Sequence, residues 1–66
     1  MSMRDPMMAT FNNDAQAVAA ATDLLNAGFL NVEHERSGGA SLVVVDPGER
    51  AADVRRIFAA HGGVEL

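Results

Sequence analysis

The sequence predicts a small α+β domain in which a strand–helix–strand unit occurs twice. Two Ala-rich segments with helical spacing, residues 14–27 and 48–61, each follow a short apolar segment and each end at glycine. A β-branched run, SLVVVD at residues 41–46, has the composition of a central strand. A hairpin between the two units gives a βαββαβ two-layer sandwich of the ferredoxin-like type, with an antiparallel sheet and both helices on one face.

The first unit begins with MMATF at residues 7–11, which we expect to form a strand. Asn13 stands where an N-cap belongs, with Gln16 as its reciprocal partner, and Gly28 suits the residue that ends a helix. The helix between them carries an apolar stripe, which we expect in the core. Its members are Ala17, Val18, Ala20, Ala21, Leu24 and Leu25.

The second strand is expected over FLNVEHER, residues 29–36, where side chains alternate between two faces. Its charged half is typical of an edge strand, because charge discourages unwanted pairing. SGGA at residues 37–40 then forms a turn, and VEL at residues 64–66 supplies a last short strand. Right-handed crossovers place the first and third strands in the centre of the sheet and the second and fourth at its edges.

The loop Asp-Pro-Gly-Glu leads from the third strand into the second helix. We expect Asp46 to be the N-cap of that helix, Pro47 its first residue and Glu49 a further favourable charge in its first turn. A helix N-terminus can also bind an anion, but two carboxylates at this position would repel phosphate. The sequence therefore favours a capping role for this loop.

At 66 residues the chain accommodates one domain, and a core of this size is only marginally stable by itself. Small chains usually compensate with disulfides, a structural metal or self-association. The absence of Cys excludes disulfides, zinc–thiolate sites and iron–sulfur clusters. We expect a single domain over residues 8–66, preceded by a disordered tail over residues 1–7, that associates with itself.

The charge distribution argues against nucleic-acid binding. The net charge is −4, and all five basic residues are Arg, of which only Arg55 and Arg56 are adjacent. Binding to a phosphate backbone requires a concentrated positive face. No apolar run approaches the ~20 residues of a membrane helix, and the N-terminal MSMRDPMM lacks the apolar core of a signal peptide. We expect a cytoplasmic protein with neither a nucleic-acid nor a membrane partner.

The sequence predicts no catalytic residues, no cofactor and no metal site. His34 lies between Glu33 and Glu35, but neighbours on a strand project to opposite faces, so the three side chains do not readily converge on a metal. No Ser, His and Asp set for nucleophilic catalysis is apparent, and SGGAS lacks the ending of a phosphate-binding loop. We therefore expect that the protein is not an enzyme.

The third strand supplies the candidates for an interface. Leu42 and Val44 point to one side of the sheet, and Val43 and Val45 to the other. Helices cover only one of these two faces, so the pair on the other face is exposed in a monomer. A second sheet from another copy, or an edge-to-edge continuation through the fourth strand, would bury it. We expect a homodimer.

Two stretches resemble the general stress protein 17M-like domain of heat-induced bacterial stress proteins. They are FNNDAQAVAAATDLLNAGF and SLVVVDPGERAADVRRIFAAHGGVEL, and the resemblance covers almost all of residues 9–66. The chain differs from longer members in the tight hairpin between its halves and in having no glycine-rich apolar extension. The resemblance implies a bacterial, cytoplasmic, stress-associated module that acts by association, and it carries over no catalytic residues.

Two functions from different classes follow. The first is a non-catalytic interaction module that binds itself or another protein. The second is a small-molecule-sensing regulatory domain with its ligand at a dimer interface. For the second function the candidate ligand-binding residues are Asn12 and Asn13 before the first helix and Asp46 and Glu49 before the second, which we expect to lie close together in the fold or across the dimer.

Overall fold

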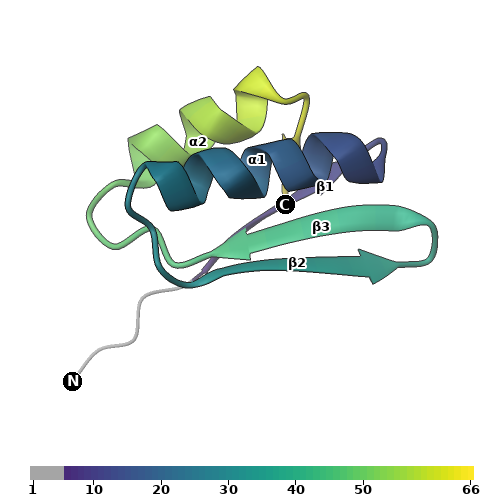
Figure 1. The fold of residues 1–66 in the computed structure, drawn as a ribbon, viewed down its shortest axis with the longest axis horizontal. Helices are drawn as coiled ribbons and strands as arrows, with labels where there is room; N and C mark the ends of the chain where they lie inside the picture. Colours follow the sequence, from purple (N-terminus) through teal and green to yellow (C-terminus); the bar gives the residue numbers. More distant parts are fainter. Residues whose placement is uncertain (1–5) are drawn as a thin grey trace.

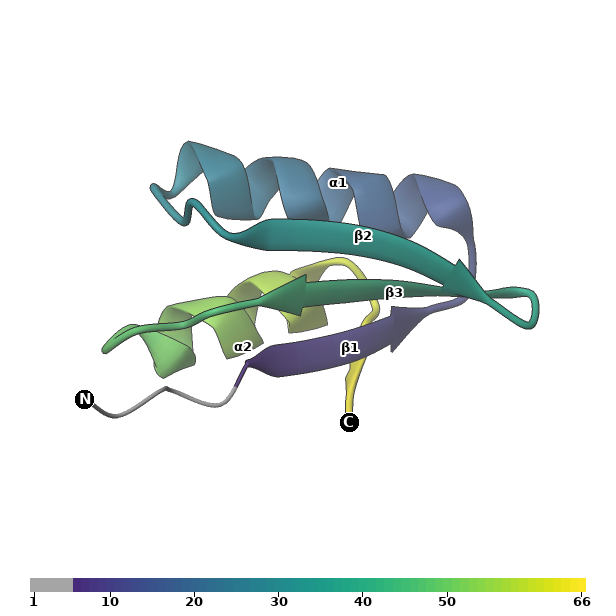
Figure 2. The same ribbon diagram turned by 90° about the horizontal axis from the view of Figure 1, so that it is seen from below.

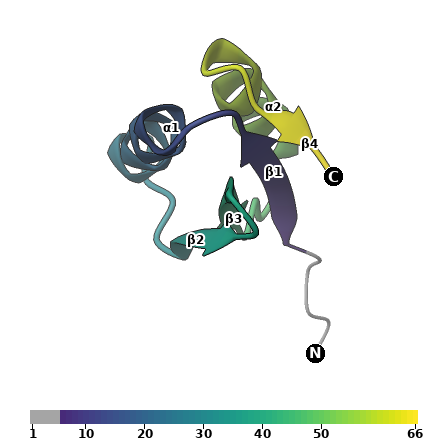
Figure 3. The same cartoon turned by 90° about the vertical axis from the view of Figure 1, so that its right-hand side faces the viewer.

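The computed structural model describes residues 6–66, apart from the side chain of Ser37. A four-stranded antiparallel sheet with the strand order β2-β3-β1-β4 carries both helices on one face (Figures 1 and 3). This is the predicted ferredoxin-like arrangement, with the predicted strands in the centre. The elements are β1 (Met7–Phe11), α1 (Asp14–Asn26), β2 (Val32–Ser37), β3 (Ala40–Val45), α2 (Ala51–Ala60) and β4 (Val64–Glu65).

The expected tail over residues 1–7 lies largely outside the described residues. Met7, its last residue, belongs to β1 and is buried. The second strand is shorter than expected, because residues 29–31 are not in a strand. Phe29 turns into the core instead, and its backbone N–H donates to the carbonyl of Leu24 at the end of α1.

The hairpin between β2 and β3 fixes which side chains share a face of the sheet. Its loop is only Gly38 and Gly39, which have φ values of 57° and 85°. Two consecutive residues with positive φ form the type of turn that matches the twist of the flanking strands, and glycine adopts it without strain. The loop thereby sets the register, in which Ser37 lies opposite Ala40 and Val32 opposite Val45.

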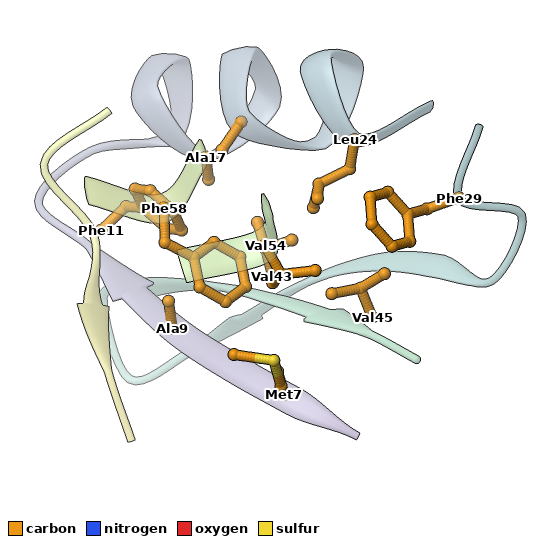
Figure 4. Packing of buried hydrophobic residues seen from close by; sticks show 11 residues of the cluster. Met7, Ala9, Phe11, Ala17, Leu24, Phe29, Val43, Val45, Val54 and Phe58 are labelled. Carbon is orange, nitrogen blue, oxygen red and sulfur yellow. The ribbon is translucent and has the colours of Figure 1, made fainter. Parts of the chain in front are cut away.

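The core lies between the helices and one face of the sheet (Figure 4). The rings of Phe11 from β1 and Phe58 from α2 meet edge to face, with their centroids 6.0 Å apart. Alternate residues of the two central strands enter the core, and Ala-rich α1 packs on them through small side chains. The buried apolar residues are Met7, Ala9, Phe11, Ala17, Ala20, Leu24, Phe29, Val43, Val45, Val54 and Phe58.

Two of the six residues in the apolar stripe of α1 lie outside the core, and Ala21 packs against the core while only partly buried. Ala17, Ala20 and Leu24 are buried as expected, whereas Val18 and Leu25 are 46% and 54% exposed. The stripe is wider than the line along which α1 touches the sheet. Because α1 lies at the flank of the sheet, beside β2 rather than above its middle, nothing within the described chain covers the outer side of the stripe (Figure 2).

The expected cap of α2 is wrong. The helix begins at Ala51, and its N-cap residue is Arg50, which makes no capping bond with its side chain. The carboxylate of Asp46 instead accepts a bond of 3.0 Å from the N–H of Gly48, within the loop. Gly48 has a φ of 57°, so the chain completes a separate turn before the helix can start.

Arg50 holds the start of α2 against the end of α1. Its guanidinium lies 4.5 Å from the centroid of the Phe29 ring, and its Nη1 donates to the carbonyl of Ala27 at 2.7 Å. A further bond joins its Nε to Asp53 one turn later. A single side chain thus connects both loops at this end of the molecule.

The two helix starts are expected to respond differently to loss of their polar side chains. Asn13 does cap α1, because its Oδ1 accepts from the N–H of Gln16 at 2.8 Å. We expect Asn13→Ala to lower the free energy of unfolding by about 1 kcal/mol. Asn13→Ser should retain most of that stability. We expect Asp46→Ala to change it by less than about 0.5 kcal/mol, since no helix cap is lost. Urea denaturation compares the variants, and a larger loss for Asp46→Ala would contradict the observed start of α2.

Gly63 provides a test of the packing where α2 turns into β4. A Cβ at this position would lie 2.7 Å from the Phe11 ring and 3.1 Å from the carbonyl oxygen of Phe58. We expect Gly63→Ala to lower the free energy of unfolding by about 1–3 kcal/mol through overpacking. In a Phe11→Leu background the offending ring atoms are absent, so the same substitution should cost less. Equal costs in the two backgrounds of this double-mutant cycle would contradict the contact.

Candidate functional site

The face of the sheet away from the helices is the larger candidate surface. Of the four interface candidates, Leu42 and Val44 lie on this open face and are partly exposed. Val43 and Val45 are fully buried beneath the helices and are therefore not available to a partner. Alternation along β3 makes this division. We call the surface around Leu42 and Val44 the open face.

Neighbouring strands extend the open face toward β4. Met8 lies opposite Val44 in the register, and Thr10 lies opposite Leu42. On the far side of β1, Val64 pairs with Thr10 and is 64% exposed. Leu66 follows, 69% exposed, with its N–H donating to the carbonyl of Met8 at 2.9 Å. Paired residues of antiparallel strands point to the same side, so these side chains form a continuous, mostly apolar surface.

At β2 the open face has an acidic border. Glu33 pairs with Val44 and Glu35 with Leu42, so both carboxylates project to the same side as these apolar residues. Both are exposed. Arg36 belongs to the alternate set of side chains, which points toward the helices and reaches Asp14 of α1. The open face thus combines an apolar centre with negative charge along one edge.

A polar cluster lies on the other side of β2, centred on Asp14 at the start of α1. Arg36 binds its carboxylate with two hydrogen bonds, from Nε at 3.1 Å and from Nη2 at 2.7 Å. His34 Nε2 lies 2.9 Å from Asp14 Oδ1, and the hydroxyl of buried Ser41 donates to the same oxygen at 3.3 Å. The cluster joins α1 to both strands of the hairpin.

The cluster brings the side chains of Ser41, His34 and Asp14 together, but not in the arrangement of a catalytic set. Their order differs from that of a catalytic triad, in which the imidazole stands between the hydroxyl and the carboxylate. Here Asp14 is central, and the Ser41 hydroxyl donates to the carboxylate rather than to His34. The hydroxyl is therefore not activated by a base. We interpret the cluster as a structural clamp.

Sequence reasoning missed this cluster, although a signal was present. The alternation in residues 29–36 places His34 and Arg36 on one side of the strand, and Asp14 is the acidic residue of the first turn of α1. A right-handed crossover brings the start of α1 to the end of β2, where those two side chains meet it. The prediction used each residue for its local role and did not combine them.

The expected ligand-binding residues do not converge within one chain. Asn13 lines an open pocket of about 360 Å³, together with Asp14, Arg36, Gly39, Ala40 and Ser41. Asn12 is exposed beside it. Asp46 and Glu49 lie at the other end of the sheet, because β1 and β3 are antiparallel. The two helix starts are therefore separated by the length of β3, which contradicts the expected proximity of these residues within the fold.

Residues 6–66 contain neither a candidate metal site nor a candidate membrane span. No group of three or more His, Cys, Asp or Glu side chains in this range is arranged so that it could hold a metal ion. Neither helix in this range has the length and apolar character that a membrane span requires.

The Asp14 clamp predicts a loss of stability in acid. Hydrogen bonding from Arg36 is the largest cause that holds the pKa of Asp14 below its ordinary value of 3.8, and partial desolvation opposes it. A carboxyl group whose pKa is lowered by folding stabilises the protein above its unfolded pKa, and this contribution is lost as pH falls through the folded pKa. We expect the difference in unfolding free energy between the wild type and Asp14→Asn to be constant near neutral pH and to shrink below about pH 4.

Urea denaturation at successive pH values measures this difference. In an Arg36→Gln background the main cause of the lowered pKa is absent, so Asp14→Asn should show a weaker pH dependence. A difference that stays constant down to about pH 2 would contradict the clamp.

Comparison with protein-family models, with curated proteins and with solved structures found no match to this chain. The resemblance to the general stress protein 17M-like domain stays a prediction, and the candidate sites rest on the geometry of the fold.

Proposed function

We propose that the protein is a non-catalytic interaction module that forms a homodimer through its open face. The observation that carries the proposal is the apolar surface formed by Met8, Leu42, Val44, Val64 and Leu66, which neither α1 nor α2 covers. A core the size of that formed by residues 6–66 is marginal by itself, so burial of a further apolar face would add substantially to it. Association through this face would bury a second apolar layer.

The energy available from this burial is large for so small a domain. At about 25 cal/mol per Å², covering roughly 300 Å² of apolar surface contributes about 7.5 kcal/mol before the entropic losses of association. Total stabilities of small domains are of the same order, about 5–15 kcal/mol. Dimerisation through the open face would therefore change the stability of each copy substantially.

Charge along β2 favours one of two symmetric arrangements. When two sheets stack face to face, a two-fold axis perpendicular to the strands would lay β2 over β2 of the second copy. Glu33 and Glu35 would then lie near the same residues of that copy. An axis along the strands lays β2 over β4 of the second copy and β3 over β1. The second arrangement keeps like charges apart and brings Val44 toward Met8 of the other copy. We propose this aligned packing of two sheets.

The cellular role follows from the resemblance and belongs to the same proposal. We propose a bacterial, cytoplasmic protein of the stress response whose action depends on association with itself or with another protein. The resemblance supports this role, and the exposed apolar face gives such association a physical basis.

Light scattering over a dilution series tests the dimer. The wild type should have about twice the monomer mass of 6.9 kDa, and Val44→Lys should reduce the mass to that of the monomer. Lysine at this position lies opposite Glu33 within its own sheet, so the variant should remain folded. In the dimer the same lysine would be buried against apolar residues, which is strongly unfavourable.

Ala52→Lys is the matched control, because Ala52 is an exposed residue of α2 and lies away from the open face. It should leave the mass of the dimer unchanged. Circular dichroism confirms that both variants fold. A mass of 6.9 kDa for the wild type at all concentrations would contradict self-association.

A further inference from the structure

We propose that the free edge of β2, together with the adjacent flank of α1, binds an extended segment of another protein in which basic and apolar residues alternate. This surface lies apart from the apolar centre of the open face and shares with that face only the acidic border along β2. In the aligned dimer proposed above, the outer edge of β2 is left free. The partner would add a strand to the sheet, a common mode of peptide recognition.

Backbone groups along β2 are available for such a strand. Within the described chain β2 pairs only with β3, so its other side is an edge. The two-residue hairpin makes Ser37 and Ala40 a hydrogen-bonded pair, and bonded pairs then alternate along the strands. The backbone N–H and C=O groups of Val32, His34 and Arg36 therefore point away from β3. These six groups form the ladder that a partner strand would use.

An exposed apolar flank runs beside this edge. Asp14 contacts His34 and Arg36, so the side of α1 that carries Asp14 is the side facing β2. Val18 and Leu25 follow on the same side of the helix at helical spacing, and both are about half exposed. Figure 3 shows α1 above β2 in an end-on view, and Figure 2 shows the two elements running side by side.

The loop between α1 and β2 continues the flank. Leu30 in this loop is 88% exposed, the highest value among the large apolar residues of the described chain. Val32 follows at the start of β2 and is only partly buried. The opposite side of α1 is occupied, because Asp23 contacts His61, the C-cap residue of α2, at 2.6 Å. Exposed apolar side chains of α1 thus gather on the side next to the free edge.

Charge on β2 disfavours a second copy of β2 as the occupant. Two antiparallel strands of one continuous sheet pair residues that point to the same side. Glu33 and Glu35 both point to the open face. If two copies of β2 pair symmetrically about His34, Glu33 of one copy lies opposite Glu35 of the other. If they pair about Glu33 or about Glu35, that glutamate lies opposite the same glutamate of the other copy. Like charges directly opposite one another destabilise a sheet. Charges on an edge also discourage aggregation in general, but that role alone does not explain the apolar flank beside them.

The same charges define a complementary partner. Side chains of the added strand that lie opposite Glu33 and Glu35 would be Lys or Arg. The alternate side chains would point toward α1 and meet Val18, Leu25 and Val32. An extended segment with alternating basic and apolar residues satisfies both requirements, because successive side chains of a strand point to opposite faces.

A labelled synthetic peptide in which Lys and Val alternate serves as the probe, and fluorescence anisotropy with the full chain measures its binding. The matched control is the same peptide with Glu in place of Lys. We expect the Lys–Val peptide to bind about tenfold more tightly than the control. It forms two favourable cross-strand pairs with Glu33 and Glu35, where the control peptide forms two unfavourable ones. The double variant Glu33→Lys and Glu35→Lys should reverse this preference. The double variant Glu33→Gln and Glu35→Gln should bind the two peptides with equal affinity.

Two further measurements separate strand addition from general attraction between opposite charges. N-methylation of alternate peptide amides removes the ladder while retaining the charge, and it should eliminate binding. Amide chemical shifts should change most at residues 32–36 and along the outer side of α1. The proposal is overturned if the Lys–Val peptide does not bind, if N-methylation has no effect, or if the shift changes map to the apolar centre of the open face around Leu42 and Val44 instead.

Discussion

The close packing of α1 on the sheet through small side chains is the constraint on which the rest of the structure depends. Ala17 and Ala20 of α1 and Ala9 of β1 are fully buried. Because these residues have only a methyl group, the helix can approach the strands closely, and larger residues such as Leu24 and Phe58 fill the space at the sides. The approach also brings Asp14 within reach of β2. Because the core is thin, the described chain has few apolar side chains left to cover the outer side of α1, where Val18 and Leu25 are exposed.

The sequence predicted the topology correctly because several independent signals agreed on it. Asn13 and Gly28 marked the limits of α1, and the β-branched run around Val43 marked a central strand. The prediction failed at Asp46, where a capping residue followed by proline is also the start of a loop turn. The motif alone does not distinguish the two, because the outcome also depends on a tertiary contact, the anchoring of Arg50 at Phe29 and at the carbonyl of Ala27.

The candidate sites were less predictable than the fold, and the reason is geometric. Alternation showed that Leu42 and Val44 share a face, but only the placement of the helices decided that Val43 and Val45 are the buried pair. The Asp14 cluster depends on a contact between residues that are 22 positions apart. The exposure of Val18 depends on where α1 lies across the sheet. Each of these facts is tertiary, so no pattern within one segment contains it.

The shortness of β4 has a consequence for motion. This strand pairs with Ala9 and Thr10 of β1, and the N–H of Leu66 donates one further bond to the carbonyl of Met8. Segments with few bonds and little burial open locally at a much lower free energy than the whole domain. The sheet is therefore expected to fluctuate between four strands and three, while the ring contact of Phe11 and Phe58 persists. The two edges are protected in different ways: β2 by charge at all times, and β1 only for the fraction of time that its short neighbour is in place.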